Sequence, residues 1–284
     1  MSKNKGRVRA IHVMAQANFE SWMYSSRTCF MFLFVTAFCY VVCGNHAQAI
    51  QGLNMHWGET LFYILYNGCN ITMTSILFLI TISEIPQRMG YQYNMLIRSN
   101  RIDWLYSQLL YCVWMVLAMT LLVVFCASVF VLPSVIFKSG WSEDLRIAQG
   151  IITEEEALVP SFIRQNFTPF SACLYALLPM FLFWITMLSV VLVFSLFGAP
   201  VIGLVFYALM LMGNVVFMVE MIAGIPMPIY YATLNNITVG WPEKEFVKYN
   251  QAMVGYVVVL LTLFIIMFFR VKRIDLEFDS ARRM

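Results

Sequence analysis

The sequence predicts an all-α membrane protein with six transmembrane helices. Of its 284 residues, 61% are apolar and 12% are charged, and the mean hydropathy is +0.76. Soluble domains are about 45–50% apolar and about 25% charged, so these few charges cannot cover the surface of a soluble globule. The apolar residues gather in runs of about 20, the length of a helix that crosses the bilayer. Because the runs do not alternate with polar residues, they do not fit transmembrane strands.

The six runs define the expected spans and divide the chain into three parts. We expect spans at about 28–45, 61–82, 106–132, 171–197, 200–222 and 252–270. Residues 1–27 form a cytoplasmic N-terminal segment, 28–270 the transmembrane domain, and 271–284 a cytoplasmic tail. No small-residue cleavage site follows the first run, so we expect it to be retained as a span. Phe197-Gly198-Ala199-Pro200 predicts a tight turn between the fourth and fifth spans.

The distribution of Lys and Arg predicts the orientation of the chain. Thirteen of the 18 basic residues lie in residues 1–27, in the loop 83–105 and after residue 269, whereas the other segments carry five. Basic residues collect on the cytoplasmic side of a membrane. We therefore expect a multi-pass protein of the cell membrane, with both termini and the 83–105 loop in the cytoplasm.

The N-terminal segment has the pattern of an amphipathic helix. Its apolar residues recur at spacings of three and four, which places them on one face; they are Val8, Ile11, Ala15, Phe19 and Trp22. A helix of this kind lies along the membrane surface with its apolar side in the acyl boundary. It serves either as an anchor or as a regulatory or gating element.

The loop between the second and third spans is longer than a simple turn requires. Pro86 and Gly90 end the second span, and Asn100 with Asp103 can begin the third. Between them, apolar residues at helical spacing predict a short amphipathic helix. This helix is either a docking surface or a solvated connector. Its candidate docking residues are Arg88, Gln92, Tyr93, Asn94, Met95 and Arg98.

Two long segments are expected on the outer side. Residues 133–170 form an acidic loop, in which Thr153 followed by three glutamates predicts the start of a short helix. This loop is either a lid or partner site, or solvated acidic decoration. The segment 223–231 is apolar, but its prolines interrupt a helix, so we expect a partly re-entrant hairpin.

Few polar residues lie inside the predicted spans. Glu220, near the outer end of the fifth span, is either a gate or path residue or an interfacial acid. Asn67, Asn70 and Thr74 form a polar stripe in the second span. The stripe fits either a polar path or hydrogen bonds between helices.

The motifs of several enzyme classes are missing. The chain has no phosphate-binding G-x-x-x-x-G-K-[ST] loop and no H-E-x-x-H or G-x-S-x-G motif. We therefore predict no catalytic residues, no metal site and no bound cofactor in this chain. The small excess of 18 basic over 15 acidic residues argues against nucleic-acid binding.

The layout as a whole resembles the permease subunit of ABC-2-type ABC exporters. The shared features are the amphipathic N-terminal segment, six spans, cytoplasmic termini and the structured loop at 84–103. The outer segment Gly224-Ile225-Pro226-Met227-Pro228 is similar to the broken outer hairpin of that family, although Asn235-Asn236 departs from its usual Asn-Pro pair. In the family, the loop after the second span holds the coupling helix that seats in the ATPase subunit.

The resemblance implies a transport subunit rather than an enzyme. Two permease chains, identical or different, would enclose a path through the lipid bilayer, and separate cytosolic ATPase subunits would bind ATP and Mg²⁺. The Met- and Phe-rich spans suit export of a hydrophobic or amphipathic peptide or lipid-like substrate, and the acidic outer loop favours a cationic one. Two alternatives remain: a lipid-acting membrane enzyme using His46, His56 and Glu59, and an ATP-independent channel or secondary transporter driven through Glu220.

Overall fold

The computed structural model of the chain is a bundle of helices. It describes residues 2–49, 56–82, 100–131, 140–150, 152–153, 157, 159–217 and 249–273. Within these ranges all the regular elements are helices and no strand occurs. The helices are α1 (Ser2–Met23), α2 (Ser26–Ala49), α3 (Trp57–Tyr66), α4 (Gly68–Ile82), α6 (Arg101–Val131), α7 (Ser142–Ala148), α8 (Ser161–Asn166), α9 (Pro169–Leu196), α10 (Pro200–Phe217) and α11 (Tyr249–Arg273).

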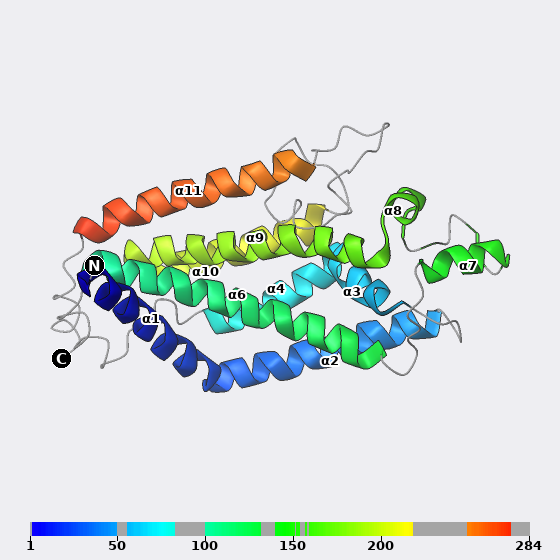
Figure 1. The fold of residues 1–284 in the computed structure, drawn as a ribbon, viewed down its shortest axis with the longest axis horizontal. Coiled ribbons are helices and arrows are strands. Elements are labelled where there is room, and N and C mark those ends of the chain that lie inside the picture. Colours follow the sequence, from blue (N-terminus) through cyan, green and yellow to red (C-terminus); the bar gives the residue numbers. More distant parts are fainter. Residues whose placement is uncertain are drawn as a thin grey trace.

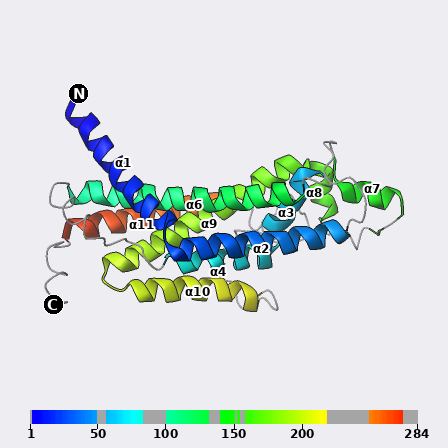
Figure 2. The ribbon, with the colours of Figure 1, turned by 90° about the horizontal axis from the view of Figure 1, so that it is seen from below.

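Helices α6 and α9 form the centre of the bundle. Helix α9 packs against α3, α6, α10 and α11, and α6 packs against α1, α2, α3 and α11. Helix α11 lies along one edge (Figure 1) and α10 along another (Figure 2). The short helices α7 and α8 cap one end, whereas the start of α1, the start of α6 and the end of α11 lie at the other (Figure 1).

The structure confirms the predicted helical, membrane-spanning character. Four helical stretches are long and apolar enough to cross a membrane, and the bent pair α3–α4 would make a fifth; the four are Ser26–Gly44, Arg101–Phe130, Pro169–Leu196 and Tyr249–Arg273. The apolar part of α10 over Pro200–Leu211 is shorter. Six spans, their orientation and the division of the chain at residues 27 and 270 stay predictions.

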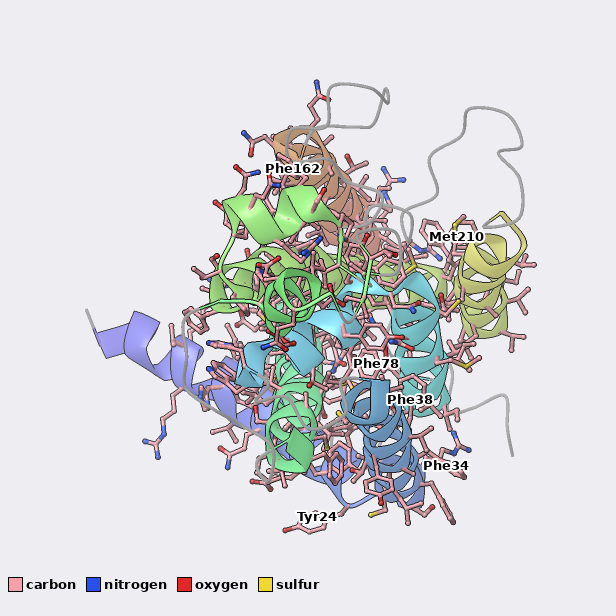
Figure 3. All side chains as sticks on the ribbon, turned by 90° about the vertical axis from the view of Figure 1, so that its right-hand side faces the viewer. Tyr24, Phe34, Phe38, Phe78, Phe162 and Met210 are labelled. Atoms are coloured by element: carbon pink, nitrogen blue, oxygen red, sulfur yellow. The ribbon has the colours of Figure 1, made fainter. Side chains whose placement is uncertain are left out.

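Large apolar side chains cover the outside of the bundle, as expected where lipid is the solvent. Tyr24 and Phe34 point outward and are more than half exposed, whereas Phe78 is fully buried between helices (Figure 3). Helix α11 is the extreme case, because only Ala252, Tyr256, Met267 and Val271 are buried among its 25 residues.

The predicted second span is not one straight helix. Residues 61–82 belong to α3 and α4, which meet at Asn67 with a bend of 78°. Hydropathy alone could not reveal this bend, because both halves are apolar.

The predicted amphipathic helix α1 is formed, but much of its apolar face contacts protein. Ala15 and Trp22 are fully buried, and α1 packs against α6 while crossing the bundle obliquely (Figure 2). Val8, by contrast, is 67% exposed. Part of the predicted apolar face therefore packs against α6, and the position of α1 along the membrane surface stays a prediction.

The turn predicted at 197–200 is present, with Gly198 at a φ of +81°, where glycine avoids the steric clash of a Cβ atom. Thr153 and Ala157 lie in irregular backbone, and residues 154–156 of the helix predicted to start at Thr153 lie outside the described residues. The described helices of this predicted outer loop are α7 and α8.

Candidate functional site

The predicted site residues divide into described and undescribed ones. Asn67 lies at the break between α3 and α4, and Asn70 and Thr74 lie in the first two turns of α4. The predicted coupling residues Arg88, Gln92, Tyr93, Asn94, Met95 and Arg98, the acid Glu220 and the outer segment 223–231 lie outside the described residues. The candidate site is therefore described from the broken helix α3–α4 and from the polar contacts at the two ends of the bundle.

Asn67 ends one helix and begins the next. Its backbone N–H donates to the Tyr63 carbonyl at 3.2 Å, which closes α3, while its Oδ1 accepts from the Cys69 N–H at 2.9 Å. Its carbonyl accepts from the N–H groups of Asn70 and Ile71 at 3.0 and 3.1 Å. Asn is favoured where a side chain must cap a helix start. These hydrogen bonds satisfy part of the backbone at the break, and backbone groups at membrane depth need such internal partners.

Asn70 and Thr74 lie on the buried side of α4. Thr74 donates its hydroxyl to the carbonyls of Asn70 and Ile71 within its own helix, both at 3.0 Å. The Asn70 side-chain nitrogen is buried and has no hydrogen-bond partner among the described residues. Neither of these donor groups joins α4 to another helix, which weakens the interhelical-bonding interpretation of the stripe.

A polar link beside the stripe was not predicted from the sequence. The Trp184 indole N–H of α9 donates to the Ser75 Oγ of α4 at 2.8 Å, and the Tyr207 hydroxyl of α10 donates to the Ser75 carbonyl at 3.4 Å. All three residues are fully buried. The available signal was the presence of Trp and Tyr inside spans, because their polar atoms usually find a partner when buried.

Glu59, in the first turn of α3, binds the predicted outer loop. It accepts from the Ser142 N–H at 2.5 Å and from the Ser142 hydroxyl with its second oxygen. Trp141 donates its indole N–H to the Phe167 carbonyl at 2.7 Å, and its ring packs edge-on against Phe62. The loop is thus seated on α3 by one carboxylate and one aromatic ring.

A second buried cluster holds α7 and α8 together. Arg164 contacts the Asp144 carboxylate at 2.5 Å and the Glu143 carboxylate at 3.9 Å, and donates to the Val159 carbonyl at 2.9 Å. Glu143 also accepts from the Val159 N–H at 3.1 Å. Glu143 and Arg164 are buried, so in this part of the loop these two charged side chains pack against each other and are not exposed to solvent.

The residues of the alternative enzyme site have other roles in the described structure. Nδ1 of His56 accepts from the Gly58 N–H at 3.1 Å and caps α3, while Glu59 is engaged by Ser142. Partial burial lowers the pKa of His56 below its ordinary value of 6.5. The side chain of His46 lies outside the described set. Among the side chains that the structure describes, no group of three His, Cys, Asp or Glu could hold a metal ion.

The opposite end of the bundle is held by basic side chains. Arg7 of α1 pairs with Asp103 in the first turn of α6 at 2.5 Å. Farther along α1, the rings of His12 and Phe19 both contact Trp114 of α6. Arg101 donates to the Lys272 carbonyl at 3.2 Å, and Arg270 donates to the Leu196 carbonyl at 3.3 Å. These contacts join α1, α6, α9 and α11 at one end.

Comparison with known proteins adds no relative. No family model, no curated protein and no solved structure matches the chain.

Proposed function

We propose that the chain is the transmembrane permease subunit of an ATP-driven exporter of the ABC-2 type. It would span the cell membrane six times with both termini in the cytoplasm and pair with a second permease chain. A separate cytosolic ATPase would bind ATP and Mg²⁺ and supply the energy. The substrate would be a hydrophobic or amphipathic peptide or lipid-like molecule.

One observation carries the proposal: the segments predicted to be cytoplasmic meet at one end of the bundle. Arg7 of α1 contacts Asp103 of α6, and Arg101 of α6 contacts Lys272 of α11. The loop 83–99 is bounded by α4 and α6, and α6 begins at this end (Figure 1). A subunit that docks on this end would therefore act on α1, α6 and α11 together.

The broken helix supports a transport role over a purely structural one. Interrupted helices in membrane transporters place backbone ends and polar side chains near the substrate path. Here α3 and α4 meet at Asn67, and the buried Asn70 nitrogen next to the break has no partner in the described chain. We place the path beside this break.

The decisive experiment is copurification with candidate ATPases encoded next to the gene. A variant carrying Arg88→Ala, Gln92→Ala, Met95→Ala and Arg98→Ala should lose the ATPase while reaching wild-type levels in the membrane. A variant carrying Arg9→Ala and Arg27→Ala is a charge-removing control on the same predicted side and should keep it.

Two results would contradict the proposal. If the purified chain transports in vesicles without an ATPase, the exporter interpretation is wrong. If the fourfold variant binds the ATPase like the wild type, the coupling loop is misassigned.

A further inference from the structure

Three cysteines lie together where α2 packs against α6. Cys39 and Cys43 are about one turn apart on α2, and Cys126 belongs to α6. The Cys39 and Cys126 thiols are hydrogen-bonded to each other, and Cys43 lies close enough to interact electrostatically with both. All three are free thiols, and all three side chains are buried. We call these residues the α2–α6 thiol cluster.

The spacing of residues along α2 builds the cluster. Thr36, Cys39 and Cys43 recur at intervals of three and four, so they share one face of the helix. Cys126 lies over this face, because its sulfur is 3.6 Å from the Thr36 hydroxyl and is also hydrogen-bonded to Cys39. Two thiols that are distant in the sequence are therefore held in contact by the packing of two helices.

Thiols in contact can be joined by an oxidant that accepts two electrons, and a hydroperoxide does this in two steps. In the first step one thiol attacks the peroxide, the O–O bond breaks, the sulfur becomes a sulfenic acid and the hydroperoxide leaves as an alcohol. In the second step the other thiol attacks the sulfenic sulfur. The S–S bond forms, the S–O bond breaks, and the hydroxyl leaves with the thiol proton as water. Because the second thiol is already in place, this step is unimolecular.

The position of the cluster selects the kind of oxidant. Its residues lie within the predicted spans 28–45 and 106–132, toward their expected outer ends. An uncharged, apolar hydroperoxide dissolves in lipid, whereas a charged oxidant is costly to transfer from water. Tyr40, which follows Cys39, is more than half exposed, so the surface of α2 that we expect lipid to cover begins next to the buried thiols.

We propose that the α2–α6 thiol cluster is an oxidation site, at which a hydroperoxide dissolved in the membrane converts Cys39 and Cys126 into a disulfide that joins α2 to α6. A dithiol reductant reverses the modification by thiol–disulfide exchange. The site goes beyond the exporter function and does not depend on an ATPase.

The test is oxidation of the full chain in vesicles of saturated phosphatidylcholine, which does not itself form hydroperoxides. One sample is treated with copper(II) phenanthroline, which oxidises neighbouring thiols, and another with cumene hydroperoxide, which is apolar. Chymotryptic peptides are then mapped by mass spectrometry, because cleavage after Tyr40 separates Cys39 from Cys43. Both reagents should give the Cys39–Cys126 disulfide within a single chain, and dithiothreitol should remove it.

Three results would overturn the proposal. If neither reagent gives the cross-linked peptide, the two thiols do not meet in the membrane. If only copper(II) phenanthroline gives it, hydroperoxides do not use the site. If the disulfide joins two chains, seen as a dimer band on a non-reducing gel, the contact between α2 and α6 within one chain is not the site of oxidation.

A pair of matched variants tests the role of the α6 thiol. Cys126→Ser preserves the size of the side chain and should abolish the cross-link between the helices. Cys112→Ser is the control, because Cys112 is also buried on α6 but lies outside the cluster, and it should give the wild-type yield. Equal losses in the two variants would contradict the assignment. The peptide map of the wild type decides the question even if Cys126→Ser does not fold.

Discussion

Glu59 connects the predicted outer loop to α3. It is buried, and both of its oxygens accept hydrogen bonds from Ser142, which lies 83 residues later in the chain. No local pattern in the sequence reports such a pairing, because it depends on where α7 returns to α3. A buried polar group left without its partner is costly, so the contact should be visible in stability.

We predict that Glu59→Ala lowers the free energy of unfolding by about 1–3 kcal/mol, since it leaves the buried Ser142 N–H and hydroxyl without an acceptor. Ser142→Ala should cost less, because the backbone N–H keeps Glu59 as its acceptor. Unfolding in mixed detergent micelles measures both. A wild-type value for Glu59→Ala would show that the contact does not hold the loop.

His56 gives the outer end a pH dependence. Its neutral Nδ1 caps α3, and burial lowers its pKa, so the unfolded chain binds the proton more readily. Stability is therefore highest above the ordinary value of 6.5 and falls as the pH drops below it. His56→Asn keeps a capping side chain that does not titrate. The difference in thermal midpoint between the two proteins should change between about pH 7.5 and 5; a constant difference would refute the assignment.

Replacing Asn70 by leucine should raise the stability of the protein and reduce its transport activity. Its buried side-chain nitrogen has no partner among the described residues, so Asn70→Leu should raise the free energy of unfolding by about 1 kcal/mol. If the path runs beside the break, the same change should reduce ATP-dependent transport in vesicles. Thr74→Val is the control, because the Thr74 hydroxyl bonds only to carbonyls of its own helix in the described contacts. Destabilisation by Asn70→Leu would instead show that the amide has a partner.

At the scale of elements, hydropathy predicted helix positions better than helix shapes. The expected spans 106–132 and 171–197 agree with α6 and α9 to within a few residues, because long apolar runs have no other stable form in a membrane. The bend at Asn67 was not predicted, because a hydropathy average does not detect where the backbone hydrogen bonds of a helix are interrupted. Asn67 followed by Gly68 was the available signal, since both residue types favour breaks in regular structure.

The amphipathic pattern of α1 shows the same limit. Spacing identifies an apolar face, but lipid and protein satisfy that face equally well. Trp22 is fully buried and Phe19 packs on Trp114, whereas Val8 is exposed. Only the tertiary fold decides which part of the face meets α6.

The packing of α9 against α10 should depend on one glycine. A Cβ atom at Gly203 would lie 2.9 Å from Phe194 Cβ and 3.2 Å from Val191 Cα, whereas one at Gly255 in α11 would meet nothing within 4 Å. We expect Gly203→Ala to lower the free energy of unfolding by about 1–3 kcal/mol through overpacking. Gly255→Ala should be neutral or stabilising by up to about 1 kcal/mol. Equal effects in micelle unfolding would mean that the two helices can separate without cost.

At the scale of the whole molecule, different charged groups lie at the two ends of the helix bundle. The ends that carry Arg7, Arg101 and Lys272 lie together, whereas Glu59 and the buried pair of Glu143 and Arg164 belong to helices at or near the opposite end. The prediction that the basic end faces the cytoplasm rests on the count of basic residues in the whole sequence. The number of crossings depends on α10, whose described apolar stretch is short.

Tag accessibility in intact cells decides both questions. A tag inserted at Gly150, in the described turn after α7, should be labelled by an impermeant reagent, because the predicted spans put three crossings between it and the N-terminus. Tags at residues 2 and 284 should be protected until the membrane is opened. If α10 did not cross, the end of α11 would emerge on the outer side, so the tag at 284 would be labelled while that at residue 2 stayed protected. Labelling of residue 2 with protection of Gly150 would reverse the orientation and contradict the assignment of the basic end to the cytoplasm.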